Sequence, residues 1–348
     1  MIKISNVPIS RDQKPFIIAE MSGNHNHSLE RAFEIVDAAA ESGAHALKLQ
    51  TYTADTITID KSEGEFFISD PKSLWKGESL YNLYKQAFTP WEWHKPIIDR
   101  CKEKGILCFS SPFDFTAVDF LEELNVPAYK IASFENVDLP LIKKVANTGK
   151  PIIVSTGMAT VQEIAEAVET IRSTGNEQII LLKCTSTYPA TPETTNILTI
   201  PHLRELFGCE VGLSDHTMGI GVSVASVALG AVVIEKHFTL NRKDGGVDST
   251  FSMEPKEMNS LVIETERAWQ ALGKINYGPT EKEKASLVFR RSLYVVEDIK
   301  AGDMITEKNV RSIRPGLGLP PKFFDLVMGK RVNQDVKRGT GLSWEMLG

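Results

Sequence analysis

Eight short apolar runs alternate with helical patterns over the first three quarters of the chain, and this alternation constrains the fold more than any other feature. The runs lie at residues 16–20, 46–50, 106–113, 128–133, 151–157, 179–188, 210–215 and 232–238. Strands that alternate with helices form parallel sheets, and such strands are apolar throughout because they are buried on both faces. Eight units of this kind predict an α/β fold, a (β/α)8 TIM barrel.

A doubly wound open sheet is the alternative architecture. It usually shows a glycine-rich dinucleotide turn after a strand, and none of the eight runs is followed by one. The stretch from Thr51 to Gln86 is too long for a simple loop, so we expect it to cover one mouth of the barrel. A last helix over residues 254–272 is expected to complete the barrel.

Capping signals mark several of the predicted helices. Thr160 and Glu163 have the spacing of a capping box, and Thr89 is expected to cap a helix whose first residue is Pro90. Apolar residues at helical intervals predict another helix within residues 28–42. Pro96 lies inside the helix expected after Thr89, so we expect that helix to be kinked or to begin late.

The composition of the sequence and the length of its apolar runs change after Gly273. Residues 277–288 are charged and contain a Gly-Pro pair, and from residue 289 the apolar runs are short and the turns rich in glycine. The run DIKAGDMI at 298–305 is echoed by DVKRGTGL at 335–342, which indicates two related turns. We therefore predict a barrel over 1–276, a linker over 277–288 and a small β-rich domain over 289–348.

Composition excludes several classes of partner. A chain of 348 residues that is 42% hydrophobic buries a large core without disulfides. Its four cysteines show no CxxC spacing and no signal peptide precedes the first strand, so we expect reduced thiols and a cytoplasmic location. The net charge of −6 argues against nucleic acid as a partner, and no apolar run approaches the ~20 residues that cross a membrane.

Polar side chains gather where the predicted strands end, and barrel enzymes build their active sites at those carboxyl ends. They are Glu20, Lys48, Gln50, Ser110, Ser111, Lys130, Ser133, Glu135, Ser155, Thr156, residues 183–188, Ser214, Asp215, His216, Glu235, Lys236 and His237. A single polar strand end is explained by a cap or a loop. Their coincidence around one rim predicts a functional site.

Lys48 and Lys130 suggest that this site binds an anion. A lysine taken singly is more often a surface charge, but both lie within apolar strands, where an unpaired ammonium is costly. Two ammonium groups among hydroxyls suit a phosphate or a carboxylate, because the cations supply charge and the hydroxyls supply directed hydrogen bonds.

His216 and His237 end successive strands and are candidates to hold one divalent metal, such as Mn²⁺ or Zn²⁺. Either histidine alone is more often structural, and His25 and His27 are alternative ligands that a polar turn explains nearly as well. Asp215 alternates with His216 on its strand, so we expect its side chain to point away from the metal.

Glu20 and Glu135 suit acid–base work or the binding of sugar hydroxyls. Paired carboxylates also occur in glycosidases, but a glycosidase does not need two lysines and a histidine pair. Hydrolysis therefore explains fewer of the residues on this rim.

The rim motifs and the tail together resemble the sialic acid synthase family, whose barrel is followed by an antifreeze-like (SAF) domain. The barrel motifs are FIIAEMSGNH at 16–25, KLQTYT at 48–53, YKIASFE at 129–135, STGM at 155–158, KCTSTYP at 183–189, GLSDHT at 212–217 and IEKHF at 234–238. The tail motifs are RRSLY at 290–294 and RPGLG at 314–318. The resemblance covers nearly the whole chain in the right order.

Within the family, the chain looks most like the pseudaminic acid branch, to which QTYT at 50–53, SPF at 111–113 and SFE at 133–135 point. Sialic acid synthases typically carry Gly-Pro-Asp-His after the metal histidine. This chain reads GGVDS at 245–249, which keeps the aspartate but not the histidine. The departure puts N-acetylmannosamine in doubt as the substrate.

The resemblance implies a transferase that condenses phosphoenolpyruvate with an acetamido-sugar aldehyde. It implies that phosphoenolpyruvate is held by Lys48, Lys130, Ser133, Ser155, Ser186 and Ser214. His216 and His237 match the metal ligands, and we expect Mn²⁺ or Mg²⁺, with Co²⁺ also compatible. Glu20 is expected to transfer protons near the aldehyde and the water. The sugar is expected to contact Gln50, Ser111, Glu135, Tyr188 and Asp248.

The resemblance also implies a domain-swapped homodimer, because Arg314 matches a SAF-domain arginine that reaches the active site of a partner subunit. A sialic or legionaminic acid synthase is the nearest alternative function. A metal-dependent hydrolase on the same barrel and a carbohydrate-binding protein without activity are more distant ones.

Overall fold

The computed structural model describes residues 2–71 and 73–348. Two compact units make up the chain, one ending at Gly273 and the other beginning at Lys274. Each unit has a hydrophobic core of its own.

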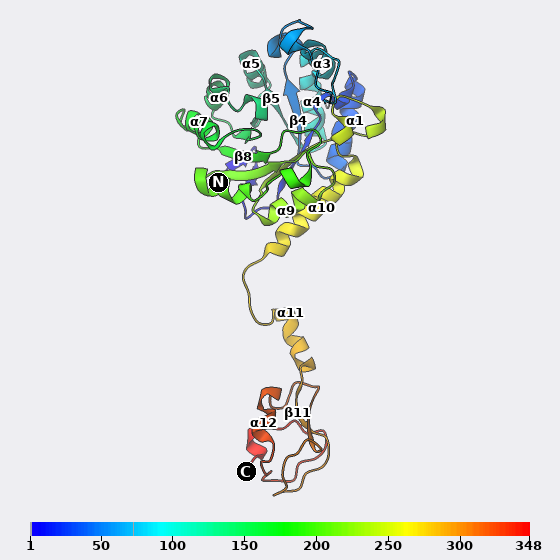
Figure 1. Cartoon of the computed structure of the whole chain (residues 1–348), viewed down its shortest axis with the longest axis vertical. Coiled ribbons are helices and arrows are strands. Elements are labelled where there is room, and N and C mark those ends of the chain that lie inside the picture. Colours follow the sequence, from blue (N-terminus) through cyan, green and yellow to red (C-terminus); the bar gives the residue numbers. More distant parts are fainter. Residues whose placement is uncertain (1, 72) are drawn as a thin grey trace. The chain divides into compact units, whose positions relative to one another are not determined.

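The first unit is a closed barrel of eight parallel strands, as the alternation predicts (Figure 1). The strands are β3 (Phe16–Glu20), β4 (Ala46–Thr51), β5 (Leu107–Pro112), β6 (Tyr129–Ile131), β7 (Ile152–Ser155), β8 (Ile179–Cys184), β9 (Glu210–Ser214) and β10 (Val233–His237). They pair in chain order, and β10 closes the ring by pairing with both β9 and β3. The TIM-barrel prediction is confirmed, and the doubly wound sheet is excluded.

Helices surround the barrel (Figure 1), and nearly every strand residue is buried between them and the barrel interior. They are α1 (Leu29–Glu41), α2 (Ala54–Ile57), α3 (Leu80–Ala87), α4 (Trp91–Glu103), α5 (Phe115–Glu123), α6 (Leu139–Ala146), α7 (Val161–Arg172), α8 (Thr199–Phe207), α9 (Gly221–Ala228) and α10 (Pro255–Leu272). Short 3-10 turns in this unit lie at Ser22–His25, Gly64–Phe66, Ser133–Glu135, Pro192–Thr194, Arg242–Asp244 and Ser249–Phe251.

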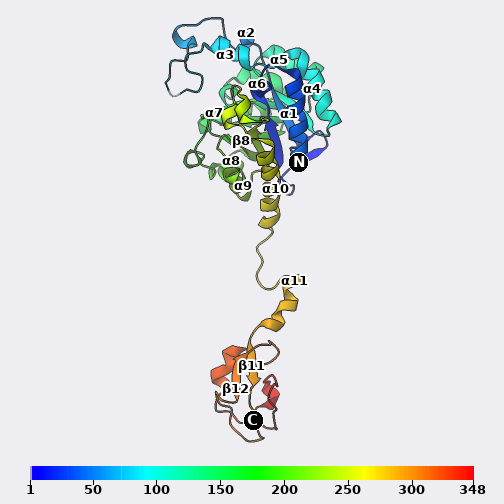
Figure 2. The ribbon, with the colours of Figure 1, turned by 90° about the vertical axis from the view of Figure 1, so that its right-hand side faces the viewer.

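The long stretch after β4 carries α2 and α3, and the segment between them projects beyond the ring of helices (Figure 2). Its Trp75 donates a hydrogen bond to the carbonyl of Val247, 3.1 Å away, in the loop after β10. Because both segments follow the carboxyl ends of strands, this stretch lies over that end of the barrel, as expected.

The predicted capping box of α7 is present: Thr160 caps the amide of Glu163, whose carboxylate accepts from the Thr160 amide at 2.7 Å. The prediction for Thr89 is wrong. Helix α4 begins at Trp91 with Pro90 as its uncapped N-cap residue, because the Thr89 hydroxyl is buried against His25 Nε2, 3.2 Å away. The helix does not begin late, since it continues from Trp91 through Pro96.

An antiparallel hairpin precedes the barrel and was not predicted. It consists of β1 (Ile2–Ile4) and β2 (Val7–Ile9), and its buried isoleucines pack into the barrel's core. Three-residue strands are too short to show a period in the sequence.

The second unit is small and contains an antiparallel pair, β11 (Ser292–Val295) and β12 (Val310–Ile313). Its helices are α11 (Glu281–Lys284), which falls within the predicted linker, and α12 (Phe324–Val327), with 3-10 turns at Ala285–Phe289, Pro321–Phe323 and Trp344–Met346.

The two echoed runs of this unit face each other. Asp298 accepts from the Arg338 amide at 2.8 Å, and the equivalent Asp335 accepts from the Ala301 amide at 2.9 Å. Ile299 and Val336 exchange two backbone hydrogen bonds of 2.8 Å between these contacts. Each turn is thus closed by the aspartate of the other.

Candidate active site

The barrel register brings residues that are far apart in sequence to one rim. Glu20 at the end of β3 lies beside His237 of β10 on one side and Lys48 of β4 on the other. Gln50 of β4 lies beside Ser111 of β5. The predicted rim is therefore formed by neighbouring strands at their carboxyl ends.

Lys48 lies between two carboxylates inside the barrel. Its Nζ is 2.5 Å from Glu20 Oε2 and 3.6 Å from Glu235 Oε1, and it donates to the hydroxyl of Ser111 at 3.3 Å. Burial by itself lowers the pKa of Lys48, but the two carboxylates outweigh burial and raise that pKa. Lys48 is therefore a charged ammonium at neutral pH.

Lys130 has no such partner. Its Nζ donates to Ser155 Oγ at 2.6 Å and to the carbonyl of Ile131 at 2.9 Å, and no carboxylate in the described part of the chain forms an ion pair with it. Burial lowers the pKa of this lysine, although the charge of Glu235 opposes the effect. A buried ammonium without a counter-ion is suited to an anionic ligand.

Two further serine hydroxyls lie beside Gly157, the second residue after Ser155. The hydroxyl of Ser133 accepts from the Gly157 amide at 3.2 Å. A Cβ on Gly157 would lie 2.1 Å from Ser186 Oγ and 2.6 Å from Ser133 Oγ, so only glycine leaves room for both hydroxyls. The segments after β6 and β8 therefore bring Ser133 and Ser186 together at Gly157, just beyond the Ser155 that contacts Lys130.

The two histidines of the predicted metal site lie side by side, with 5.3 Å between their ring centroids. His216 Nδ1 donates to the carbonyl of Thr185 at 3.0 Å, which leaves its Nε2 free to act as a ligand. His237 Nδ1 is buried, lies 3.8 Å from Asp248 Oδ2, and has no hydrogen-bond partner among the described residues.

The pair therefore fits a divalent ion that takes two nitrogens from the protein and its other ligands from substrate or water. Among residues 2–71 and 73–348, no group of three or more histidine, cysteine, aspartate or glutamate side chains is arranged to hold a metal. His25, the alternative ligand, has both ring nitrogens engaged, with the amide of His27 and the hydroxyl of Thr89.

Asp215 points away from the histidines, as strand alternation predicts. Its Oδ2 lies 3.1 Å from the ammonium of Lys236 and accepts from Ser223 Oγ at 2.6 Å. Lys236 also donates to the carbonyls of Thr217 and Gly219, at 2.6 and 3.0 Å. This buried pair fixes the loop that follows His216 from the outer side of the barrel.

The residues expected to hold a sugar line the same rim. Gln50 donates to Glu20 Oε1 at 3.2 Å, and Asp248 accepts from the hydroxyl of Ser22. The ring of Tyr188 lies 4.6 Å from that of His216 and 6.0 Å from that of Trp75. Tyr188 and Asp248 lie beside the histidines, and Trp75 of the projecting segment lies beside Tyr188.

Two carboxyl groups have pKa values close to neutral pH. Burial, opposed by Lys48, raises the pKa of Glu20 to about 7, and burial, opposed by Lys130, raises that of Glu135 to about 7. Each therefore holds or releases a proton readily near pH 7, as general acid–base catalysis requires.

Sequence analysis placed Glu235 on the rim but assigned it no role in the site. It is buried between Lys48 and Ser214, and the charges of Lys130 and Lys48 outweigh its burial and hold its pKa below the usual range. Strand alternation was the available signal, because Glu235 and His237 are two residues apart and share the inner face. Arg314, in contrast, lies in the second unit, after β12.

Family models match both units of the chain. The NeuB family model matches residues 35–277, and the SAF domain model matches residues 290–348. The sequence is 45% identical to pseudaminic acid synthase of Campylobacter jejuni over 331 residues, 95% of this chain and 96% of the relative.

Two further proteins extend the comparison. N,N'-diacetyllegionaminic acid synthase of Legionella pneumophila is 36% identical over 338 residues, 95% of this chain and 94% of that protein. The solved N-acetylneuraminic acid synthetase of Leptospira borgpetersenii superposes with a TM-score of 0.73 at 33% identity, over 82% of this chain and 94% of that one.

Proposed function

Since the chain belongs to the NeuB family, we propose that it is a pseudaminic acid synthase. The reaction condenses phosphoenolpyruvate with 2,4-diacetamido-2,4,6-trideoxy-L-altrose to give pseudaminic acid and phosphate. The observation that carries this choice is the 45% identity to a pseudaminic acid synthase over 95% of the chain, against 36% to a legionaminic acid synthase.

Phosphoenolpyruvate binds around Lys130. This ammonium is buried, forms no ion pair in the described chain and donates to Ser155, while Ser133 and Ser186 lie beside Gly157, two residues further along. An anion there supplies the missing counter-charge and accepts from the hydroxyls. Lys48 and Ser214, joined through Glu235, complete the set that positions C3 of phosphoenolpyruvate for reaction.

His216 and His237 hold a divalent metal, with Mn²⁺ or Mg²⁺ as the first candidates and Co²⁺ as a further one. The unpartnered Nδ1 of His237 and the free Nε2 of His216 support this assignment. When bound, the ion supplies a Lewis acid beside the aldehyde of the sugar.

The other residues of the rim orient the sugar and move protons. Gln50, Ser111, Glu135, Tyr188 and Asp248 bind the open-chain sugar. C3 of phosphoenolpyruvate attacks its C1, water adds at C2, and phosphate leaves by cleavage of the C–O bond. Glu20, with its pKa of about 7, exchanges a proton with the aldehyde oxygen and the attacking water.

The active form is a domain-swapped homodimer in which the SAF domain brings Arg314 to the partner's active site. Exposed apolar side chains on the loops after β6 to β9 support a covered rim, since they gain from burial. These are Phe134, Met158, Leu198 and Met218, which are 50–75% exposed.

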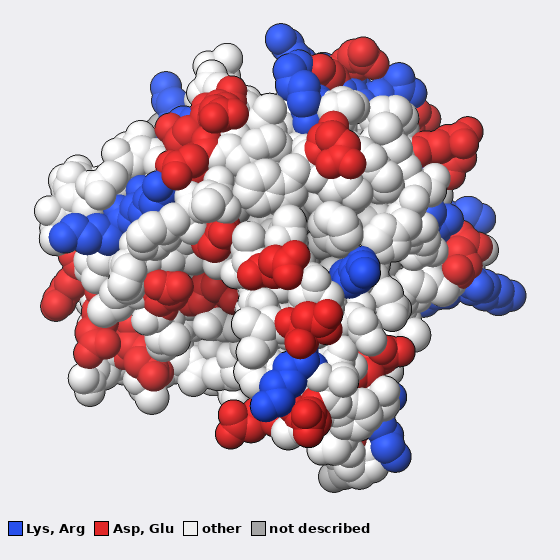
Figure 3. All heavy atoms as spheres, turned by 90° about the horizontal axis from the view of Figure 1, so that it is seen from above, with Lys and Arg blue, Asp and Glu red and all other residues white. Residues whose placement is uncertain are grey.

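We place the enzyme in the cytoplasm, where phosphoenolpyruvate is produced. All four cysteines are free and buried, as suits a reducing compartment. None of the helices in the described chain is both long and apolar enough to span a bilayer. Acidic and basic side chains are interspersed on the face shown in Figure 3.

A substrate panel tests the proposal. Purified protein is incubated with phosphoenolpyruvate, Mn²⁺ and each candidate acetamido sugar, and the product is identified by mass and NMR. We expect the highest kcat/KM with the altrose derivative and one phosphate released per product. A preference for the legionaminic acid precursor or N-acetylmannosamine identifies the alternative synthases, and turnover without phosphoenolpyruvate identifies a hydrolase.

A further inference from the structure

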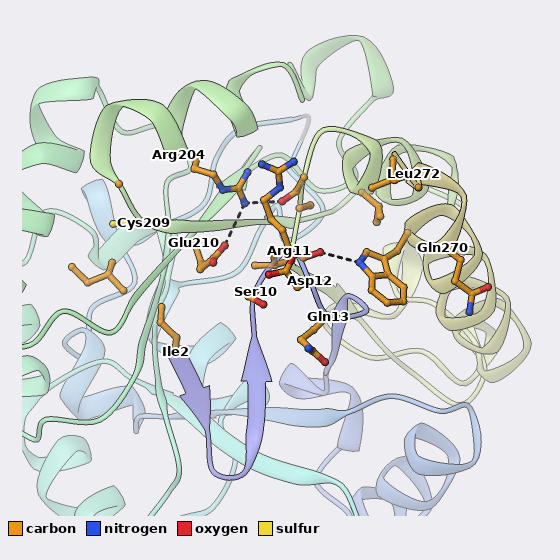
Figure 4. A pocket seen from close by; sticks show the side chains of 18 of the residues that line it. Ile2, Ser10, Arg11, Asp12, Gln13, Arg204, Cys209, Glu210, Gln270 and Leu272 are labelled. Carbon is orange, nitrogen blue, oxygen red and sulfur yellow. Dashed lines mark hydrogen bonds and ion pairs between the residues drawn. The ribbon is translucent and has the colours of Figure 1, made fainter. Parts of the chain in front are cut away.

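A second pocket, of about 1100 Å³, lies at the opposite end of the barrel from the candidate active site (Figure 4). It is lined by Ile179 and Glu210, the first residues of β8 and β9, and by Val232, just before β10. Because the strands are parallel, these amino ends lie away from the rim that carries Lys48 and His237. The segment after β2 and the end of α10 complete the lining, so the pocket belongs to the first unit alone.

Two guanidinium groups meet in this pocket. Arg204 NH1 and Arg11 Nε lie 2.8 and 3.5 Å from the point where a Cβ on Gly230 would stand, and Figure 4 shows both side chains extending to the same place. Arg204 donates to the carbonyl of Gly230 at 2.7 Å and lies 3.6 Å from Glu210. The side chain of Arg11 makes no hydrogen bond or ion pair with any residue that the structure describes. Its backbone carbonyl accepts a hydrogen bond from the indole of Trp269 at 2.9 Å.

Of the two guanidiniums, Arg204 is paired with Glu210, whereas Arg11 has no ion-pair partner among the described residues. Burial lowers the pKa of Arg204, and the like charge of Arg11 adds to the effect while Glu210 opposes it. Two other acidic residues line the pocket: Glu177, which is paired with Arg172 at 3.1 Å, and Asp12, which forms no ion pair with either arginine. A carboxylate suits the site, because it accepts from two guanidinium groups at once.

The pocket also contains acceptors that need a donor. Ser10 Oγ is buried and has no hydrogen-bond partner among the described residues, and buried Glu210 Oε2 accepts no hydrogen bond although it lies 3.6 Å from Arg204 NH2. A ligand whose carboxylate is next to a hydroxyl satisfies both needs, since its carboxylate meets Arg11 and its hydroxyl donates to Glu210. Ile2, Val227 and Trp269 supply apolar surface for methyl groups.

We propose that this pocket binds an acidic acetamido sugar, the chemical class of the product in the proposed function, on which the assignment of class rests. A 2-ulosonic acid carries its carboxylate and a hydroxyl on the same carbon, which matches Arg11 and Arg204 beside Glu210. Its acetamido methyl groups pack against the apolar surface of Ile2, Val227 and Trp269. The enzyme thus has a second site for its product, at the end of the barrel remote from the chemistry.

Calorimetric titration of the full-length protein tests this, in phosphate-free buffer with pseudaminic acid as the first probe and N-acetylneuraminic acid as the second. We expect two sites per chain, one at each end of the barrel. Arg11→Gln should lose one site or weaken it at least tenfold, since a charge-assisted hydrogen bond is removed. Arg11 is exposed and unpaired, so the substitution leaves the fold intact.

Lys14→Gln is the matched control, because Lys14 lies on the same segment outside the pocket and its pairing with Glu266 is exposed. We expect this variant to retain both sites. Equal stoichiometry and affinity in Arg11→Gln and wild type would overturn the proposal, as would a single site in the wild type. Inorganic phosphate that competes as strongly as the sugars would overturn the assigned ligand class.

The binding experiment and the substrate panel can fail independently of each other. If the substrate panel yields no pseudaminic acid while Arg11-dependent binding of acidic sugars persists, the proposed reaction fails and the pocket stands. If pseudaminic acid is made but binds at one site only, the reaction stands and the second site fails.

Discussion

The carboxylate of Asp215 lies 3.1 Å from the ammonium of Lys236, and these two residues are the sequence neighbours of His216 and His237. Both side chains are almost completely buried, on the outer side of strands whose inner side carries the histidines. One ion pair therefore ties together the two strand ends that present the candidate metal ligands.

Removing one partner of this pair should destabilise the barrel strongly. Lys236→Met leaves Asp215 buried without its cation and frees two carbonyls, so we expect a loss of about 3–5 kcal/mol in the free energy of unfolding. Urea denaturation measures it, and Mn²⁺ affinity should fall with it. Lys95→Met, which breaks an ion pair whose members are 63% and 50% exposed, should change stability by less than about 1 kcal/mol. Similar losses in both variants would contradict the role of the buried pair.

His237→Ala should abolish metal-stimulated activity and leave the fold intact, because the imidazole makes no hydrogen bond through Nδ1. Activity is measured over a range of Mn²⁺ concentrations, with the thermal midpoint as the control for folding. Near-normal turnover in excess Mn²⁺ would count against the assignment of His237 as a ligand.

Lys130→Met should separate binding from stability. Loss of the ammonium removes charge-assisted hydrogen bonds to phosphoenolpyruvate, so kcat/KM for that substrate should fall about 100-fold or more. Stability should change little, because relief from burying the ammonium offsets the loss of its attraction to Glu235. A variant that unfolds early in urea yet keeps its affinity for phosphoenolpyruvate would show that Lys130 is structural.

Arg314→Ala in the full-length chain should raise the KM for the sugar without altering the fold, since Arg314 is exposed in its own unit. Deletion of residues 289–348 should impair sugar binding severely for the same reason. Sedimentation of the wild type should give a dimer. An active, monomeric barrel that lacks the SAF domain contradicts the swapped-dimer proposal.

Protonation of His45 should weaken the fold in acid. Its Nδ1 accepts from the amide of Ile17 at 2.9 Å, and burial lowers the pKa of His45 from 6.5 to about 4. The unfolded chain binds this proton near pH 6.5 and the folded chain does not, so stability present above pH 6.5 is lost as pH falls toward 4.

Urea titrations at several pH values measure that loss, which amounts to at most about 1.4 kcal/mol per pH unit. His45→Asn keeps an acceptor near the Ile17 amide but does not titrate, so its stability should fall less steeply below pH 6.5. Identical slopes for the variant and the wild type would rule out this contribution.

The barrel could be predicted from sequence because all eight strands are buried on both faces and read as apolar runs. The rim followed from it, since the carboxyl ends of parallel strands share one end of the barrel. Contacts between distant segments could not be predicted. The Thr89 hydroxyl is used by His25 rather than by the helix that follows it, and Glu235 acquires its role only between Lys48 and Ser214.

The pocket at the amino ends of the strands was also beyond prediction. Arg11 and Arg204 are 193 positions apart in the numbering of the chain, and they meet only because the segment after the unpredicted hairpin returns to the barrel beside Gly230. A three-residue strand leaves no periodic signal, so the residues that it positions cannot be placed from sequence.

Mutual closure of the turns at Asp298 and Asp335 limits how the small domain can be re-engineered. Neither half is complete without the other, so a cut, graft or circular permutation between these aspartates opens both turns at once. New termini therefore belong outside that span.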